Sequence, residues 1–172
     1  MNFKELKELY LYNNNISDIK VLEKVKFNKL EKLNLGSNKI SNNINILENV
    51  DFKELKELNL RNNNISDIKV LEKVKFNKLE ILYLYSNKIS NINILENVDF
   101  KELKELNLYD NNISDIKVLE KVKFNKLKKL DLGSNKISNN SNILENVDFK
   151  ELNLFDNNIS DIKVLEKVKF NK

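Results

Sequence analysis

The sequence predicts an α/β solenoid, in which short parallel strands line a concave face and short α-helical or 3₁₀ segments line a convex face. Three observations predict it. A motif of the form Leu-x-x-Leu-x-Leu-x-x-Asn-x-Ile recurs every 24 or 25 residues, apolar residues alternate within the motif, and apolar residues then recur at every third position. We expect a single domain over residues 1–172 with about seven repeats. Six full copies begin at Leu6, Leu30, Leu55, Leu79, Leu103 and Leu127, and a shortened seventh copy runs from Glu151.

The leucine motif of each copy predicts a short strand with one buried face. In the first copy, Leu9 and Leu11 alternate with Tyr10 and Tyr12. Successive side chains of a strand point to opposite faces of the sheet. We therefore expect the leucines in the core and the tyrosines on the outer, concave surface.

An asparagine follows each strand, where the chain must bend. Backbone groups buried at such a bend need hydrogen-bond partners, and an inward asparagine amide can both donate and accept. We interpret this column as a structural ladder between coils, in preference to a polar binding stripe. Its members are Asn14, Asn38, Asn63, Asn87, Asn111, Asn135 and Asn157.

The segment after the bend predicts one or two turns of 3₁₀- or α-helix. Ile16, Ile19, Leu22 and Val25 recur at every third position, and Asp18 lies where a helix N-cap is useful. An aspartate recurs here in alternate copies, so these carboxylates are roughly 10 Å apart at a strand spacing of ~4.8 Å. Metal ligands lie ~2.0–2.6 Å from their ion, so we predict helix caps and no metal site.

Composition excludes several classes of function. The chain has no cysteine and no histidine, so it lacks disulfides, thiolate metal sites and the commonest general base. Two glycines cannot build a glycine-rich phosphate loop. No apolar run approaches the roughly 20 residues of a transmembrane helix. We expect no enzyme activity, no cofactor and no membrane span, and a cytoplasmic location.

These residues resemble leucine-rich-repeat proteins over nearly the whole chain. The pattern Leu-x-x-Leu-x-Leu-x-x-Asn-x-Ile-x-x-Ile-x-x-Leu is most similar to the subclass that includes the regulatory leucine-rich-repeat subunit of protein phosphatase 1, and to bacterial internalins. The resemblance implies a parallel sheet on the concave face with short helices outside, but it does not imply one partner. The polar or cysteine-rich caps common in the family are missing, so we expect uncapped ends that self-associate or belong to a longer array.

Aromatic residues are segregated between the two sides of the predicted strands. All five tyrosines fall at positions that face the concave surface, whereas eight of nine phenylalanines occupy a structural column at the end of each copy. Exposed aromatics are typical interface anchors, and Arg61 should lie beside Tyr85 on the next strand. The alternative is that tyrosine is an ordinary strand former. We predict partner binding through Tyr10, Tyr12, Arg61, Tyr83, Tyr85, Tyr109 and Phe155, with Asp110, Asp131 and Asp156.

Charge narrows the class of partner. The concave positions hold seven acidic and three basic residues, although the whole chain carries a net charge of +4. A nucleic-acid reader needs aromatic residues in a basic groove, so we predict a protein partner with a basic patch. Three alternatives stay open: a structural or self-assembling unit without a dedicated ligand, a secreted adhesion module, and, by resemblance alone, a phosphatase-1 regulatory subunit.

Overall fold

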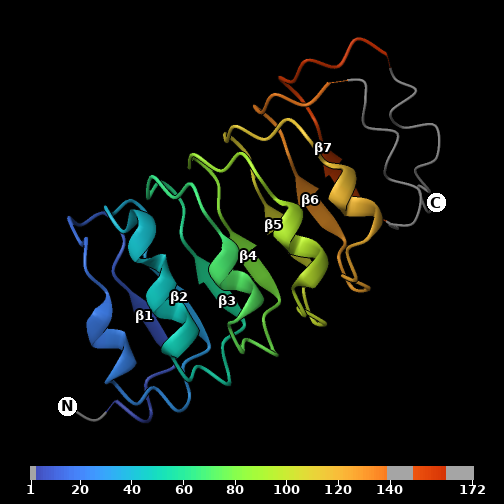
Figure 1. Ribbon diagram of the computed structural model, residues 1–172. Coiled ribbons are helices and arrows are strands. Elements are labelled where there is room, and N and C mark those ends of the chain that lie inside the picture. The colour runs from blue at the N-terminus through green and yellow to red at the C-terminus, as the bar shows by residue number, and fades with distance from the viewer. Residues whose placement is uncertain (1–2, 139–148, 162–172) are drawn as a thin grey trace.

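The sheet is a single parallel layer built from one strand per repeat. A computed structural model of the chain describes residues 3–138 and 149–161. Within these ranges, seven strands lie side by side in the order of the sequence (Figure 1). The α/β solenoid predicted from the repeat is confirmed. The strands are β1 (Glu8–Tyr10), β2 (Lys32–Asn34), β3 (Glu57–Asn59), β4 (Ile81–Tyr83), β5 (Glu105–Asn107), β6 (Lys129–Asp131) and β7 (Glu151–Asn153).

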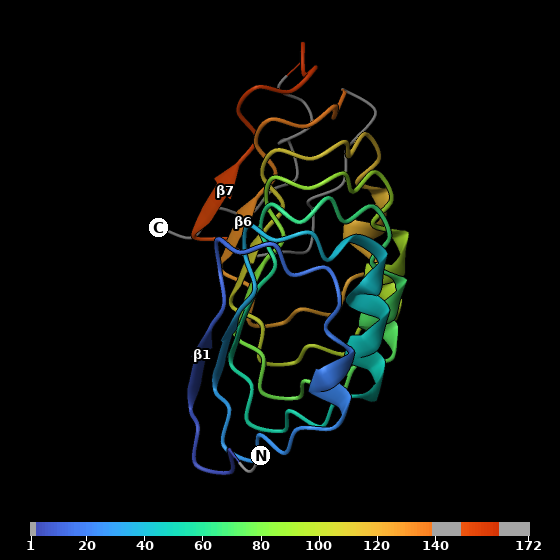
Figure 2. The same cartoon turned by 90° about the vertical axis from the view of Figure 1, so that its left-hand side faces the viewer.

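The convex face carries 3₁₀-helices, opposite the sheet (Figure 2). A 3₁₀-helix has three residues per turn, which matches the three-residue apolar spacing of the sequence. No helix in the part of the chain that the structure describes is long and apolar enough to cross a bilayer. The helices are η1 (Lys20–Glu23), η2 (Ser41–Asn49), η3 (Lys69–Glu72), η4 (Asn93–Asn97) and η5 (Lys117–Glu120).

The aspartates before these helices accept a hydrogen bond from the first helical residue, as capping side chains do, although the N-cap position itself is held by the isoleucine that follows each aspartate. The Oδ1 atom of Asp18 accepts a hydrogen bond from the backbone N–H of Lys20, the first residue of η1, at 2.7 Å. Asp67 and Asp115 do the same for η3 and η5, each at 2.9 Å. Residues 3–138 and 149–161 contain no group of three or more side chains that could hold a metal ion.

The core lies between the sheet and the helices and runs the length of the array. The strand leucines are in register, so that Leu58 of β3 lies beside Leu82 of β4, and both are fully buried. The phenylalanine column also stacks from coil to coil, with ring centroids 6.3 Å apart for Phe52 and Phe76. The predicted structural role of this column is therefore confirmed.

Each asparagine at the bend from Asn38 onward connects its own coil to the preceding one, whereas Asn14 in the first coil bonds only within its own coil. The Nδ2 of Asn87 donates to the carbonyl oxygens of Leu84 at 2.9 Å and of Leu60, one coil earlier, at 3.1 Å. Its Oδ1 accepts the backbone N–H groups of Asn63 and Ile65, both at 3.0 Å. Because this asparagine is buried, it satisfies backbone groups that water cannot reach. The predicted ladder is confirmed.

Charged residues outside the core alternate between odd and even copies and pair across them. The pairs Lys29–Glu5 and Lys78–Glu54 have nitrogen–oxygen distances of 2.6 Å, and Lys126 repeats the pattern with Glu102. Such exposed pairs stabilise little. In these three pairs an odd copy supplies the acid and the following even copy supplies the base, whereas Lys56–Glu31 and Lys104–Glu80 run the other way.

Candidate binding surface

Three rows of side chains cross the strands on the concave face. The rows arise because every strand is in register with its neighbours and alternate residues point away from the core. The first row is Glu8, Lys32, Glu57, Ile81, Glu105, Lys129 and Glu151. The second row is Tyr10, Asn34, Asn59, Tyr83, Asn107, Asp131 and Asn153. The third row, just after the strands, is Tyr12, Gly36, Arg61, Tyr85, Tyr109, Gly133 and Phe155.

The predicted aromatic residues are all on this outer surface. Tyr10, Tyr12 and Phe155 are 50%, 46% and 55% exposed. Tyr83, Tyr85 and Tyr109 and the side chain of Arg61 are partly exposed. Their predicted segregation from the phenylalanine core is therefore confirmed, while their role in binding stays a prediction.

Arg61, Tyr83 and Tyr85 form a contact cluster at the centre of the face. The Nη1 of Arg61 donates a hydrogen bond to the hydroxyl of Tyr85 at 2.7 Å, and its Cζ lies 5.7 Å from the Tyr85 ring centroid. The rings of Tyr83 and Tyr85 meet edge to face, with centroids 6.1 Å apart. The predicted Arg61–Tyr85 contact is confirmed. These contacts restrict the rotamers of all three side chains before any partner arrives.

The two glycines of the chain let bulky neighbours lie flat across the third row. A Cβ on Gly133 would be 2.7 Å from the ring of Phe155, and one on Gly36 would be 2.7 Å from Cγ of Arg61. Phe155 thereby reaches across β6 and stacks on Tyr109, with ring centroids 5.6 Å apart. Sequence analysis missed this pair, because Tyr109 and Phe155 belong to strands that are not adjacent.

The three aspartates predicted to bind have structural roles in addition. Asp110 and Asp156 have φ angles of 54° and 52°, in the left-handed region that aspartate, asparagine and serine tolerate best. The Oδ1 of Asp131 accepts the backbone N–H of Gly133 at 3.0 Å. Asn59 makes the same contact to the N–H of Arg61 at 3.1 Å. Turn geometry thus accounts for these residue types, and binding through them stays a prediction.

The lysines of the first row form ion pairs with the glutamates nearest the two ends of the sheet. Lys32 lies 3.0 Å from Glu8, and Lys129 lies 3.0 Å from Glu151. A hydrogen bond from Lys129 to Glu151 raises the pKa of this lysine above its ordinary value, so it stays charged at neutral pH. Ile81, at the middle of the row, was missed by sequence analysis. The signal was available, because Ile81 is the one uncharged residue among the seven of the row.

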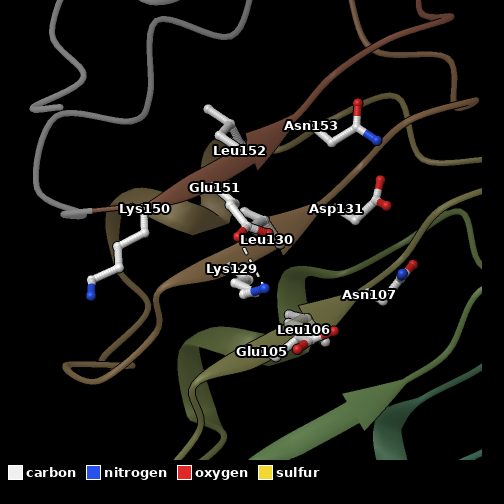
Figure 3. A pocket seen from close by; sticks show the side chains of 10 residues that line it. All are labelled: Glu105, Leu106, Asn107, Lys129, Leu130, Asp131, Lys150, Glu151, Leu152 and Asn153. Carbon is white, nitrogen blue, oxygen red and sulfur yellow. Dashed lines mark ion pairs between the residues drawn. The ribbon is translucent and has the colours of Figure 1, made fainter.

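An open hollow of about 490 Å³ lies over β5, β6 and β7. Figure 3 shows Lys129 between Glu105 and Glu151, with the amide and carboxylate groups of the second row beside them. The lining is polar, and the Lys129–Glu151 pair already offsets part of its charge. The hollow therefore extends the concave surface, without the apolar enclosure of a small-molecule pocket.

The family follows from comparison with known sequences. The family model described as "Leucine Rich repeats (2 copies)" matches residues 4–49, 53–97 and 101–148 of the chain. A second model, "Leucine Rich repeat", matches residues 145–162. The chain belongs to the leucine-rich repeat family. Leucine-rich repeats are commonly protein–protein interaction modules, and proteins built from them are typically binding scaffolds without enzyme activity.

Several solved leucine-rich repeat structures are similar to the chain. An internalin of Listeria monocytogenes has a TM-score of 0.80 at 30% identity, over 96% of this chain and 46% of its own. Internalin C2 of the same species has a TM-score of 0.77 at 30% identity, over 96% of this chain and 69% of its own. A Leptospira interrogans leucine-rich repeat protein has a TM-score of 0.63 at 26% identity, over 98% of this chain and 49% of its own.

These comparisons test the predicted resemblance to internalins and to the phosphatase-1 regulatory subclass. The likeness to internalins is confirmed, and the phosphatase-1 subclass stays a prediction. The chain spans about half the length of the first internalin, 46%. A comparison with curated protein sequences finds no match.

The Tyr83 hydroxyl lies near carboxylates on both neighbouring strands of the leucine-rich repeat surface. Burial raises the pKa of the Tyr83 hydroxyl to about 12, and the carboxylates of Glu105 and Glu57 add to the rise. Carboxylates on both neighbouring strands thus disfavour the negatively charged form of Tyr83. The same field favours a positive group of a partner at this place.

We expect the Tyr83 hydroxyl to ionise well above the ordinary tyrosine pKa. At about pH 11, between the ordinary and the raised pKa, Tyr83→Phe should therefore remove little tyrosinate absorbance. Since the pKa of Tyr83 is raised in the folded state, its contribution to the free energy of unfolding is fully present below the ordinary tyrosine pKa. It is lost as pH rises toward about 12. Loss of a full tyrosine's share of the tyrosinate absorbance at that pH would contradict the assignment.

Proposed function

We propose that the chain is a non-enzymatic scaffold that binds a protein partner through the aromatic and acidic concave face. The observation that carries the proposal is the placement of every tyrosine outside the core, on the sheet face opposite the described helices (Figure 2). Leucine-rich repeats commonly serve protein–protein interaction, and the acids among the aromatics favour a partner with a basic patch over nucleic acid.

The central cluster supports this proposal energetically. Tyrosine and arginine are enriched among the residues that dominate binding energy. Arg61 and Tyr85 already hold each other at 2.7 Å, so a partner loses little additional side-chain entropy on meeting them. A pre-ordered aromatic cluster at the middle of a concave sheet is therefore the part of the face best suited to anchor a partner.

Affinity capture from a native extract tests the proposal. We expect the double substitution Tyr83→Ala with Tyr85→Ala to reduce captured partner by at least about tenfold. Circular dichroism should remain unchanged, because neither tyrosine belongs to the buried core. The matched control is Lys69→Ala with Lys117→Ala, on the exposed convex surface of η3 and η5. Equal capture by the tyrosine variant and the wild type would refute the concave assignment.

A second candidate function is self-association through the end of the array at β1. Val21 in η1 is 63% exposed, whereas its equivalents Val70 and Val118 are 3% and 5% exposed because a preceding coil covers them. A second copy stacked on this end would bury Val21. Light scattering should then show a mass that grows with concentration, and Val21→Lys should abolish the growth. A constant monomer mass would eliminate this candidate.

A regulatory role toward protein phosphatase 1 rests on the sequence resemblance alone. Direct binding of the purified chain to the phosphatase is the measurement that tests it. A phosphatase that binds wild type and the Tyr83→Ala, Tyr85→Ala variant equally would not be the partner of the concave face.

A further inference from the structure

Strand β4 differs from the other described strands in its outward residues. Ile81, Tyr83 and Tyr85 place an apolar or aromatic side chain in all three rows of the concave face. Each of the other strands puts a lysine or glutamate in the first row. We call these three residues the β4 stripe. It is partly exposed and crosses the face at its middle, with three strands on either side.

In the first row, the residues on both sides of the β4 stripe carry negative charge. Ile81 pairs in register with Glu57 of β3 and Glu105 of β5. The lysines of the next strands, Lys32 and Lys129, form their ion pairs outward with glutamates at the two ends of the sheet. Within residues 3–138 and 149–161, neither Glu57 nor Glu105 forms an ion pair with a lysine or arginine. In the first row the stripe thus lies between two carboxylates that have no ion pair among the described residues, although the charges of Lys32 and Lys129 act on them from the outer side.

We propose that the β4 stripe is the docking site for a partner segment that presents one apolar side chain between two lysine or arginine side chains. This inference rests on the proposed function and names the chemistry of the partner. The apolar side chain packs on Ile81 and Tyr83, and the two basic groups meet Glu57 and Glu105. Charge-assisted hydrogen bonds to carboxylates are stronger than neutral ones, and the methylene stems of lysine or arginine can cover the adjacent rings.

The spacing of the sheet sets the spacing of this segment. Adjacent strands are ~4.8 Å apart, so the two carboxylates stand roughly 10 Å apart on either side of the stripe. An extended segment repeats its facing side chains every second residue, about 6.7 Å apart. In a sequence of the form basic-x-apolar-x-basic that runs across the strands, the two basic residues are about 13 Å apart. Their long, flexible side chains can bend inward over the difference of about 3 Å, so that each one reaches one glutamate. Arg61, held by the Tyr85 hydroxyl at 2.7 Å, repels these groups from the third row and directs them to the first.

The chain itself supplies a substitution that tests the stripe. Lysine occupies the position of Ile81 in both β2 and β6, so Ile81→Lys should fold normally while filling the stripe with a cation. We would select peptides of nine random residues by display on the wild-type chain. Basic-x-apolar-x-basic sequences should be enriched, and Ile81→Lys should weaken their binding by at least about tenfold in fluorescence anisotropy. Glu120→Gln is the matched control, because it makes the same change of net charge on the exposed surface of η5.

A second variant tests the two carboxylates without touching the apolar residues. Glu57→Gln with Glu105→Gln should weaken the enriched peptides by about tenfold or more and make the remaining binding less sensitive to salt. Enriched peptides without basic residues, or none enriched at all, would overturn the inference. If enriched peptides without basic residues lost binding to the Tyr83→Ala, Tyr85→Ala variant, the proposed function would stand and only the inference about basic groups would fall. Peptide binding that no substitution on the concave face alters would contradict both the inference and the proposed function.

Discussion

Replacement of Asn87 by alanine is expected to lower the free energy of unfolding by roughly 3–5 kcal/mol. The side chain is buried, and it connects two coils through carbonyl oxygens of Leu60 and Leu84 and backbone N–H groups of Asn63 and Ile65. Alanine cannot replace these bonds, and an unsatisfied buried polar group costs about 1–3 kcal/mol. The effect is large because one amide serves several backbone groups.

Urea unfolding followed by circular dichroism measures this effect, and the chain contains its own control. Asn14 has the same position in the first copy, but it is exposed, and its Nδ2 donates to the carbonyl oxygens of Leu11 and Tyr12 within its own coil. We expect Asn14→Ala to cost less than about 1 kcal/mol, because water can replace these bonds. Similar losses from both variants would show that the ladder does not stabilise the array.

Replacement of Leu82 by alanine is expected to cost about 2–5 kcal/mol. Leu82 is fully buried in β4, between Leu58 of β3 and Leu106 of β5. The cavity would weaken both interfaces of the central coil. In a solenoid each repeat is stabilised mainly by its neighbours, so the coils on both sides should also lose protection.

Hydrogen exchange monitors this loss coil by coil. We expect faster exchange in β3, β4 and β5 of Leu82→Ala than in the wild type. Leu9→Ala is the matched control, since Leu9 occupies the same position in β1 but is only partly buried. Its effect should be smaller and confined to the first coil. A loss restricted to β4 in Leu82→Ala would contradict the nearest-neighbour account.

The features that follow from repeat spacing could be predicted from the sequence. Period-two alternation placed Leu9 inside and Tyr10 outside, and the need to satisfy buried backbone groups explained the asparagine column. The contact of Arg61 with Tyr85 followed as well, because equal positions in adjacent strands must be neighbours. These features depend on position within one repeat.

The features that depend on neighbouring side chains could not be predicted in the same way. The left-handed backbone at Asp110 explains its residue type without a ligand, and the stack of Tyr109 on Phe155 requires the missing Cβ of Gly133 between them. The pairing of Lys32 with Glu8, which leaves Glu57 without an ion pair among the described residues, also appears only in the structure. In each case a side chain could contact any of several neighbouring groups, and repeat spacing alone does not determine which one it contacts.

Stability and binding are assigned to opposite sides of the same strands. The inward leucines and the asparagine ladder hold the coils in register, and this register places the β4 stripe between its two carboxylates. Substitutions on the outer face, such as Ile81→Lys, should therefore change binding without changing folding. Substitutions on the inner face, such as Leu82→Ala, should change both.

Site-specific photo-cross-linking tests the central claim, that the concave face is where the partner binds. A benzoylphenylalanine in place of Tyr85 would project from the third row, and one in place of Lys117 would project from the exposed surface of η5. On irradiation in native extract, we expect the partner to be cross-linked through position 85 and not through position 117. Cross-linking of the partner through position 117 alone would contradict the account.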